Sequence, residues 1–269
     1  MTDILLPLPA SAVSGSLIAC GQVCFVGAGP GDAELLTLKA LRALSEAEVV
    51  IHDRLVSDDI LALANPAALL VNAGKEGFGP SMSQEEINRL LVLHAFSGAR
   101  VVRLKGGDPA IFGRLDEEIE ALDAEQIGWT VVPGITAASA SVASIGQSLT
   151  KRGRNANLRI LTGHDMKGFA DHDWRTLARP GEVAAIYMGK KAAHFIQGRL
   201  MMHGASPDTP VTLVENASRA DERVIATTLG ALVQDLSAAD LTGPALTLFG
   251  LAPRAAATAL PEIRKQEVS

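Results

Sequence analysis

Aromatic residues and cysteines are scarce in this chain of 269 residues. Phe, Trp and Tyr make up only 4% of the residues, whereas Gly, Ala, Val and Leu are abundant, so we expect an aliphatic core in which helices lie closely on a sheet. Cys20 and Cys24 are the only cysteines, and two cysteines cannot complete a tetrahedral zinc site. We interpret both as small buried or edge residues of a reduced, cytoplasmic protein.

Long apolar runs and metal-ligand clusters are also missing from the sequence, and its acidic residues outnumber its basic ones. No unbroken apolar run reaches about 18 residues, so no membrane span is predicted. The first twenty residues contain Asp3, Pro7 and Pro9 but no Lys or Arg, which a signal peptide requires, so we expect residues 1–20 to form a loose tail. The net charge of −6 argues against a nucleic-acid role, and the six histidines are too scattered to predict a metal site.

Strand-like and helix-like segments alternate through the first half of the chain. Such alternation predicts an α/β lobe with a mostly parallel sheet, which we assign to residues 21–134. The last strand-like segments of the second half follow one another closely, so residues 135–260 are predicted to form an α/β lobe with a mixed sheet, followed by a tail at 261–269. Strands are predicted at 22–28, 48–52, 69–72, 100–104, 129–132, 158–162, 183–188, 211–215, 223–228 and 245–250.

The segment from Arg100 to Glu118 is the one around which the first half is organised. After a strand-like start, Gly106-Gly107 lets the backbone turn where a side chain would not fit. Asp108-Pro109 then delays the next helix until after Gly113, because a residue before proline avoids the α region. The corner lies at the carboxyl end of a strand, where open α/β sheets bind ligands, although a plain βα turn with a capping Asp has the same pattern.

A second glycine loop, Gly27-Ala28-Gly29-Pro30-Gly31-Asp32, follows the first predicted strand. It is similar to the dinucleotide-binding G-x-G-x-x-G pattern, but Pro30 interrupts it and Asp32 would compete with a pyrophosphate for the helix amides. We therefore disfavour NAD. A nucleotide-binding oxidoreductase or a non-catalytic binding module remains the alternative from a different class.

Eight segments between about residues 22 and 252 together resemble the tetrapyrrole methylases, in particular the branch that methylates uroporphyrinogen III. The resemblance implies two α/β lobes with S-adenosylmethionine bent into the cleft between them, usually in a homodimer. It also implies methylation of uroporphyrinogen III at carbons 2 and 7, through precorrin-1, to precorrin-2 on the routes to sirohaem, cobalamin or haem d1. The segments are 26–32, 52–56, 102–109, 112–114, 132–137, 161–164, 186–189 and 214–216.

The same resemblance implies two groups of site residues. Those facing the tetrapyrrole would be Asp53, Lys75, Arg114, Glu117 and His164. Those lining the S-adenosylmethionine site would be Pro30, Gly106, Gly107, Asp108, Ile111, Thr136, Ala137, Met188 and Ala217.

A substrate with eight carboxylates requires a local basic rim on an acidic protein. Methyl transfer to an electron-rich pyrrole carbon mainly requires the two reactants to be held in line, which can contribute about 7–11 kcal/mol. A base must then take a proton from the macrocycle, and Asp53 or Glu117 can accept it while Lys75 relays it. Arg114, always charged, suits a propionate, whereas Lys190 and Lys191 are expected to be solvated surface charges. The rim candidates are Lys75, Arg103, Lys105, Arg114, Lys151, Arg152, Arg154, Lys167, Lys190 and Lys191.

Two alternatives within the family stay open at this point. A methyltransferase acting on a later corrinoid, or on another macromolecule, would use the same cofactor corner. The basic loop at residues 151–154 does not separate these possibilities.

Overall fold

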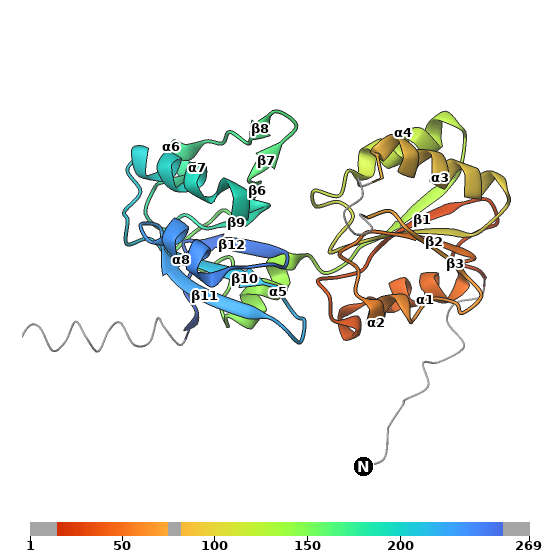
Figure 1. The fold of residues 1–269 in the computed structure, drawn as a ribbon, viewed down its shortest axis with the longest axis horizontal. Coiled ribbons are helices and arrows are strands. Elements are labelled where there is room, and N and C mark those ends of the chain that lie inside the picture. Colours follow the sequence, from red (N-terminus) through yellow and green to blue (C-terminus); the bar gives the residue numbers. More distant parts are fainter. Residues whose placement is uncertain (1–14, 75–81, 255–269) are drawn as a thin grey trace, which may run out of the picture.

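The computed structural model describes residues 15–74 and 82–254, which form two α/β lobes (Figure 1). The sheet of the first lobe has the strand order β3-β2-β4-β1-β5, and every pairing in it is parallel. This confirms the prediction of a mostly parallel first sheet. Its strands are β1 (Val23–Gly27), β2 (Val49–His52), β3 (Leu69–Asn72), β4 (Val101–Lys105) and β5 (Trp129–Val132).

Helices cover both faces of this sheet, as the alternating pattern predicts. Helices α1 (Leu38–Glu46) and α2 (Asp58–Leu61) lie on one face, and α3 (Gln84–Phe96) and α4 (Leu115–Ala124) lie on the other (Figure 1). Two apolar clusters result, one on each side of β1 and β4. The central strands β1 and β4 are buried along their whole length, so their carboxyl ends are held rigidly.

The segment after the first strand contains two short helical elements. Asp32 caps a short 3₁₀ turn, η1 (Ala33–Leu35), and Thr37 then begins α1 by accepting a hydrogen bond from the Ala40 amide at 3.1 Å. Leu38 is exposed, whereas the small Ala40 and Ala43 face the sheet. Leu44 is also fully buried, so the apolar face of α1 consists of Ala40, Ala43 and Leu44.

The second lobe has a mixed sheet, as predicted, in the order β11-β10-β12-β9-β6. Its strands β6 and β9 are parallel and the other three pairings are antiparallel. A small hairpin, β7 (His164–Asp165) and β8 (Gly168–Phe169), was not predicted. The sheet strands are β6 (Arg159–Thr162), β9 (Ala184–Tyr187), β10 (Pro210–Glu215), β11 (Arg223–Thr228) and β12 (Ala245–Phe249).

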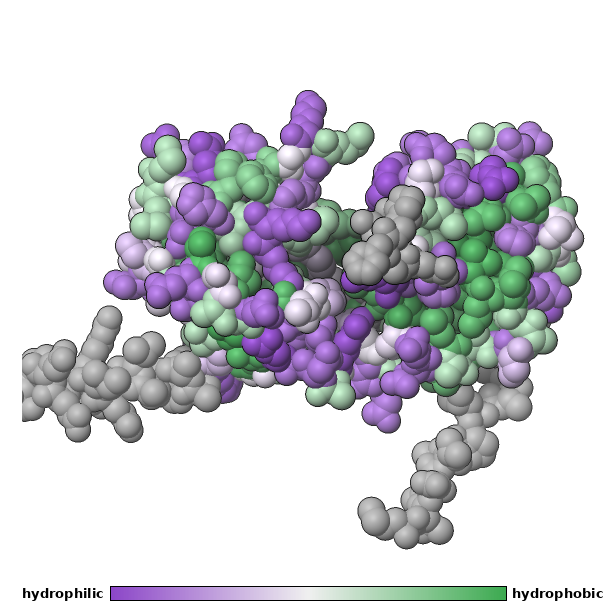
Figure 2. Space-filling model, viewed as in Figure 1, coloured by the Kyte–Doolittle hydropathy of each residue, from purple (hydrophilic) through white to green (hydrophobic). Residues whose placement is uncertain are grey.

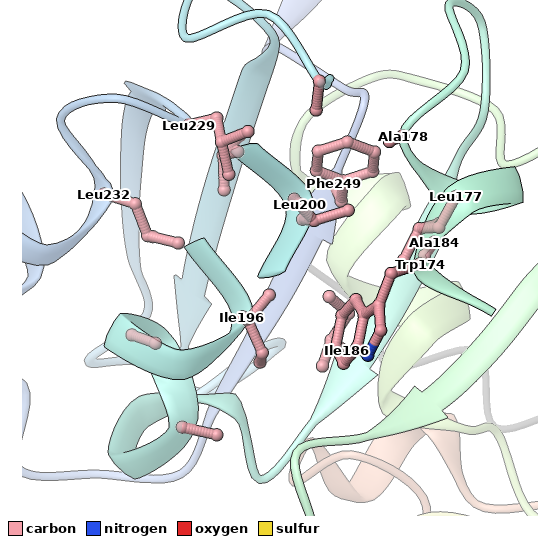
Figure 3. Close-up of a cluster of buried hydrophobic side chains, with 14 of the residues drawn as sticks. Trp174, Leu177, Ala178, Ala184, Ile186, Ile196, Leu200, Leu229, Leu232 and Phe249 are labelled. Atoms are coloured by element: carbon pink, nitrogen blue, oxygen red, sulfur yellow. The ribbon is translucent and has the colours of Figure 1, made fainter. Parts of the chain in front are cut away.

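Side chains on the two faces of this second sheet form two separate cores. Helix α5 (Ala137–Ser144) packs on one face with Ala185 and Leu248. Helices α6 (Trp174–Leu177), α7 (Gly189–Met202) and α8 (Leu232–Ala239) pack on the other, where Ile186, Leu200 and Phe249 meet (Figure 3). The sheet thus supports α5 on one side and α7 on the other.

Part of the stretch expected to be a loose tail is anchored to the first lobe. Ile18 belongs to the core, and the Leu17 amide donates to Glu46 at 2.6 Å. Cys20 is exposed and Cys24 is buried, as expected for edge and core positions. No helix in the described ranges is long and apolar enough to cross a membrane.

Candidate active site

A cleft of about 720 Å³ lies between the two lobes, and this volume suits a small-molecule site. Figure 2 shows the molecule notched between its two halves. On the first lobe, the residues after β1, β2 and β4 line the cleft, so it lies at the carboxyl ends of parallel strands. On the second lobe it is lined by the start of α5, the ends of β9 and β10, and the beginning of the antiparallel β12.

Glycines allow three loops to meet at the floor of this cleft. A Cβ on Gly27 would lie 2.5 Å from the Gly134 nitrogen and 2.7 Å from the Gly107 oxygen. Gly29 and Gly107 exchange backbone hydrogen bonds of 3.1 and 2.7 Å, and Gly107 has a φ of 69°. A side chain at Gly27 would separate the loops, whereas Gly107 is required for its left-handed φ and not for lack of space.

Asp108 ties this corner to the connection between the lobes. One carboxylate oxygen accepts from the Ala110 amide at 2.8 Å, and the other accepts from the Gly134 amide at 3.0 Å. Asp108 therefore shapes the corner in addition to lining the cleft.

All nine residues expected to line the cofactor site come together around this cleft. They come from five separate segments of the chain and include backbone as well as apolar side-chain surface. They are Pro30, Gly106, Gly107, Asp108, Ile111, Thr136, Ala137, Met188 and Ala217.

The residues expected to face the tetrapyrrole divide into two groups. Of the described residues, those lining the cleft include Asp53 and His164 but neither Arg114 nor Glu117. Arg114, just before α4, and Glu117, in its first turn, form an exposed pair at 2.5 Å, and the hydrogen bond from Arg114 lowers the pKa of Glu117. Lys75 lies outside the described residues.

His164 has a defined orientation at the second-lobe wall. Its Nδ1 lies 3.2 Å from the Met188 carbonyl oxygen, and its ring packs edge-on against Phe169 at 5.0 Å. The β7–β8 hairpin thus holds the imidazole beside a cleft-lining backbone.

Arg103 and Lys105 lie on strand β4 and not in a loop, although Lys105 does line the cleft as the rim prediction required. Both are buried on β4, where Lys105 Nζ lies 2.9 Å from each oxygen of Glu118. Arg103 contacts Glu118 at 3.1 Å and Asp53 at 2.6 Å. Burial lowers the pKa of Lys105, and the neighbouring Arg103 lowers it further. The strand positions alternate faces, and these two side chains point into the α3–α4 side of the lobe.

The expectation for Lys190 was also wrong, because its ammonium is not simply solvated. Lys190 Nζ donates to the carbonyl oxygens of Leu241 and Gly243, and the residue lines the cleft together with the exposed Lys191. The remaining rim candidates lie elsewhere: Lys151, Arg152 and Arg154 surround a separate hollow of about 580 Å³, and Lys167 lies exposed between β7 and β8.

Tyr187 and Ser141 line the cleft but were not predicted as site residues. The Tyr187 hydroxyl accepts from the Ala138 amide at 3.0 Å and bonds the Thr136 hydroxyl, so it fixes the start of α5. Its ring lies 5.3 Å from Phe112 of the first lobe. The Ser141 hydroxyl is buried and has no hydrogen-bond partner in the described part of the chain. The sequence signal for Tyr187 was its place as the single tyrosine, directly before Met188.

The two lobes, the glycine corner and the cleft between them define an α/β protein with a small-molecule site. The chain belongs to the Tetrapyrrole (Corrin/Porphyrin) Methylases, whose family model matches residues 22–233. It is 47% identical over 230 residues to a siroheme synthase from Edwardsiella ictaluri and 43% identical over 230 residues to one from Pseudoalteromonas translucida. Each match covers 86% of this chain and 49% of the relative, so the chain spans about half the length of these curated relatives.

Solved structures agree with the family assignment. The native uroporphyrin III C-methyl transferase from Thermus thermophilus is 39% identical with a TM-score of 0.72, and the match covers 85% of this chain and 92% of that one. The complex of the Thermus enzyme with S-adenyl homocysteine is 41% identical with a TM-score of 0.73, covering 85% and 97%. A cobalt precorrin-4 methyltransferase is 27% identical with a TM-score of 0.78, covering 86% and 95%.

The cleft suits S-adenosylmethionine, the cofactor of this family. Gly106 and Gly107 expose bare backbone to it, and Ile111, Ala137 and Met188 supply apolar surface. The unpartnered Ser141 hydroxyl adds a polar group that a ligand could satisfy.

Proposed function

We propose that this chain catalyses the S-adenosylmethionine-dependent C-methylation of uroporphyrinogen III at carbons 2 and 7, through precorrin-1, to precorrin-2. The observation that carries the proposal is the cleft itself, where nine expected cofactor positions from separate segments meet Asp53 and His164. The 39–41% identity to the Thermus enzymes supports the choice of substrate.

The residues around the cleft have distinct tasks in this proposal. Bound S-adenosylmethionine supplies an electrophilic methyl group. The rigid corner at Gly106 to Asp108 orients it toward the pyrrole carbon, and the apolar lining excludes water from the transfer. Asp53, at the end of β2, takes the proton that the macrocycle loses.

The basic groups of the cleft complement an acidic substrate. Lys190, Lys191 and Arg219 line it, and guanidinium and ammonium groups form charge-assisted hydrogen bonds with carboxylates. Arg114, the residue before α4, would bind a propionate after its guanidinium leaves Glu117. Lys75 is proposed to relay a proton.

A homodimer is proposed as well, and sedimentation at micromolar concentration tests it.

The substrate is tested by offering the purified chain uroporphyrinogen III or a later, already methylated corrinoid with S-adenosylmethionine under anaerobic conditions. Mass spectrometry of the products should show two methyl groups added to uroporphyrinogen III. In rate measurements, kcat/KM should be larger for uroporphyrinogen III than for the later corrinoid. Preferred methylation of the later corrinoid would refute the proposed specificity.

A further inference from the structure

Strand β4 carries two cations at positions where packing alone would favour apolar side chains. Arg103 and Lys105 lie on the same face as Val101, and that face is covered by α3 and α4. Their exposed fractions are 2% and 3%, and neighbouring Phe25 and Ile51 are fully buried. Burying a charge is unfavourable unless the charge is paired and hydrogen-bonded.

Glu118 of α4 provides the pairing. Its carboxylate is completely buried and accepts hydrogen bonds from Lys105 at 2.9 Å, from Arg103 at 3.1 Å and from the side-chain amide of Gln84 at 3.2 Å. Asp53 is the fourth charge, bonded to Arg103 Nη2 at 2.6 Å. We name Asp53, Arg103, Lys105 and Glu118 the β4 charge cluster, and its two cations and two anions balance.

The β4 charge cluster leads from the sealed interior of the first lobe to the cleft. Glu118 is at its closed end, whereas the Asp53 side chain is 35% exposed and lines the cleft wall. Buried ion pairs are often no more stabilising than well-packed apolar residues of similar size. Fold stability therefore does not explain why these buried positions carry charges. The contact of the cluster with the candidate site at Asp53 suggests a functional explanation.

We propose that Arg103 and Glu118 are positioning residues that hold the Asp53 carboxylate where it can accept the proton released after methyl transfer. The proposal rests on the proposed function. In the transfer, a C–C bond forms and the C–S bond breaks, its electron pair stays on sulfur, and the positive charge passes to the macrocycle. A macrocycle proton then moves to Asp53, which becomes neutral and later releases the proton to water.

The planar guanidinium explains why arginine is suited to this position. Arg103 uses Nε for Glu118 and Nη2 for Asp53, so one rigid group fixes the spacing of two carboxylates. Glu118 in turn is fixed by Lys105 and Gln84, which prevents the guanidinium from rotating. A lysine at position 103 would keep the charge but could not span both partners.

The test compares Arg103→Lys and Glu118→Gln with Glu120→Gln, a matched change at an exposed position of the same helix. In the two cluster variants kcat should fall about 100-fold, while KM for the tetrapyrrole and Kd for S-adenosylhomocysteine stay within about threefold of wild type. Glu120→Gln should behave as wild type. Crystal structures should show the Asp53 carboxylate displaced in Arg103→Lys.

A variant that fails to fold is replaced by the triple change Arg103→Met, Lys105→Met and Glu118→Leu, which fills the same space with apolar groups and should fold. A folded cluster variant with kcat within about twofold of wild type, or an unmoved Asp53 in Arg103→Lys, overturns the inference. Wild type that is inactive on uroporphyrinogen III refutes the proposed function instead, and the position of Asp53 in the variant crystals still decides the role of Arg103.

Discussion

At the scale of single residues, Asp108 does more than the sequence indicated. The sequence indicated a ligand-binding corner or a capping Asp, and in the structure its carboxylate also joins the Ala110 amide to the Gly134 amide of another segment. Asp108→Ala should therefore weaken S-adenosylhomocysteine binding at least about tenfold and also cost about 1.5–3 kcal/mol of unfolding free energy, the range for hydrogen bonds to charged groups. Calorimetry and urea unfolding measure the two effects. Asp116→Ala, at an exposed site of α4, is the control, and unchanged affinity in Asp108→Ala would remove Asp108 from the site.

Gly106 and Gly107 look equivalent in the sequence but differ in the structure. Gly107 has a φ of 69°, whereas the φ of Gly106 is not left-handed and a Cβ there would lie 3.4 Å from the Leu55 Cβ. Gly107→Ala should lose about 1–2 kcal/mol of stability through backbone strain. Gly106→Ala should melt near the wild-type temperature. Equal thermal stability of the two variants would contradict this distinction.

Arg114 is proposed to contact the tetrapyrrole, and in this structure its guanidinium binds Glu117. Arg114→Lys keeps the charge and loses the bidentate geometry, so we expect turnover to fall between about tenfold and about 1000-fold. The affinity for S-adenosylhomocysteine should stay near the wild-type value. Normal turnover, or a parallel loss of cofactor affinity, would show that Arg114 has another role.

At the scale of elements, the connection from β10 to β11 joins the lobes across the cleft. The Asp32 amide donates to the Ser218 hydroxyl at 3.2 Å, and Arg219 Nη2 donates to the Leu55 carbonyl oxygen at 2.5 Å. The Arg219 side chain also covers Gly31, where a Cβ would lie 2.5 Å from Arg219 Nε. Arg219→Ala should raise the dissociation rate of S-adenosylhomocysteine about tenfold, the effect of losing one charged hydrogen bond. Stopped-flow displacement measures it against Arg175→Ala, an exposed α6 control, and equal rates would contradict the bridging role.

The elements themselves were largely predictable, because period and capping are local properties. Ser83, followed three residues later by Glu86, is a local capping pattern, and the Ser83 hydroxyl accepts from the Glu86 amide at 3.2 Å at the start of α3. Burial of charge was not predictable in the same way. Arg103 and Lys105 look like surface residues until a carboxylate 13 to 15 positions away, Glu118, is brought against them. Lys190 was misassigned for the same reason, since its carbonyl partners lie more than 50 positions away.

At the scale of the whole molecule, the two lobes could be predicted and the details of their contact could not. Alternating segments indicate a parallel sheet, and closely spaced strands indicate antiparallel pairs. The cleft depends on contacts between the lobes, such as the Tyr187 ring against Phe112 and Arg219 against the Leu55 carbonyl. Neither contact leaves a periodic signal in the sequence. The family resemblance supplied what local pattern could not, namely which loops were expected at the cofactor site, and these loops line the cleft.

The central claim is that the cleft between the lobes is the S-adenosylmethionine site, and a calorimetric titration of S-adenosylhomocysteine into wild type and Gly106→Val tests it most directly. Wild type should bind one molecule per chain. Gly106→Val should keep its circular dichroism spectrum and lose the binding heat, because its side chain would stand at the bare backbone of the cleft. A folded Gly106→Val variant that binds with wild-type affinity would contradict the account.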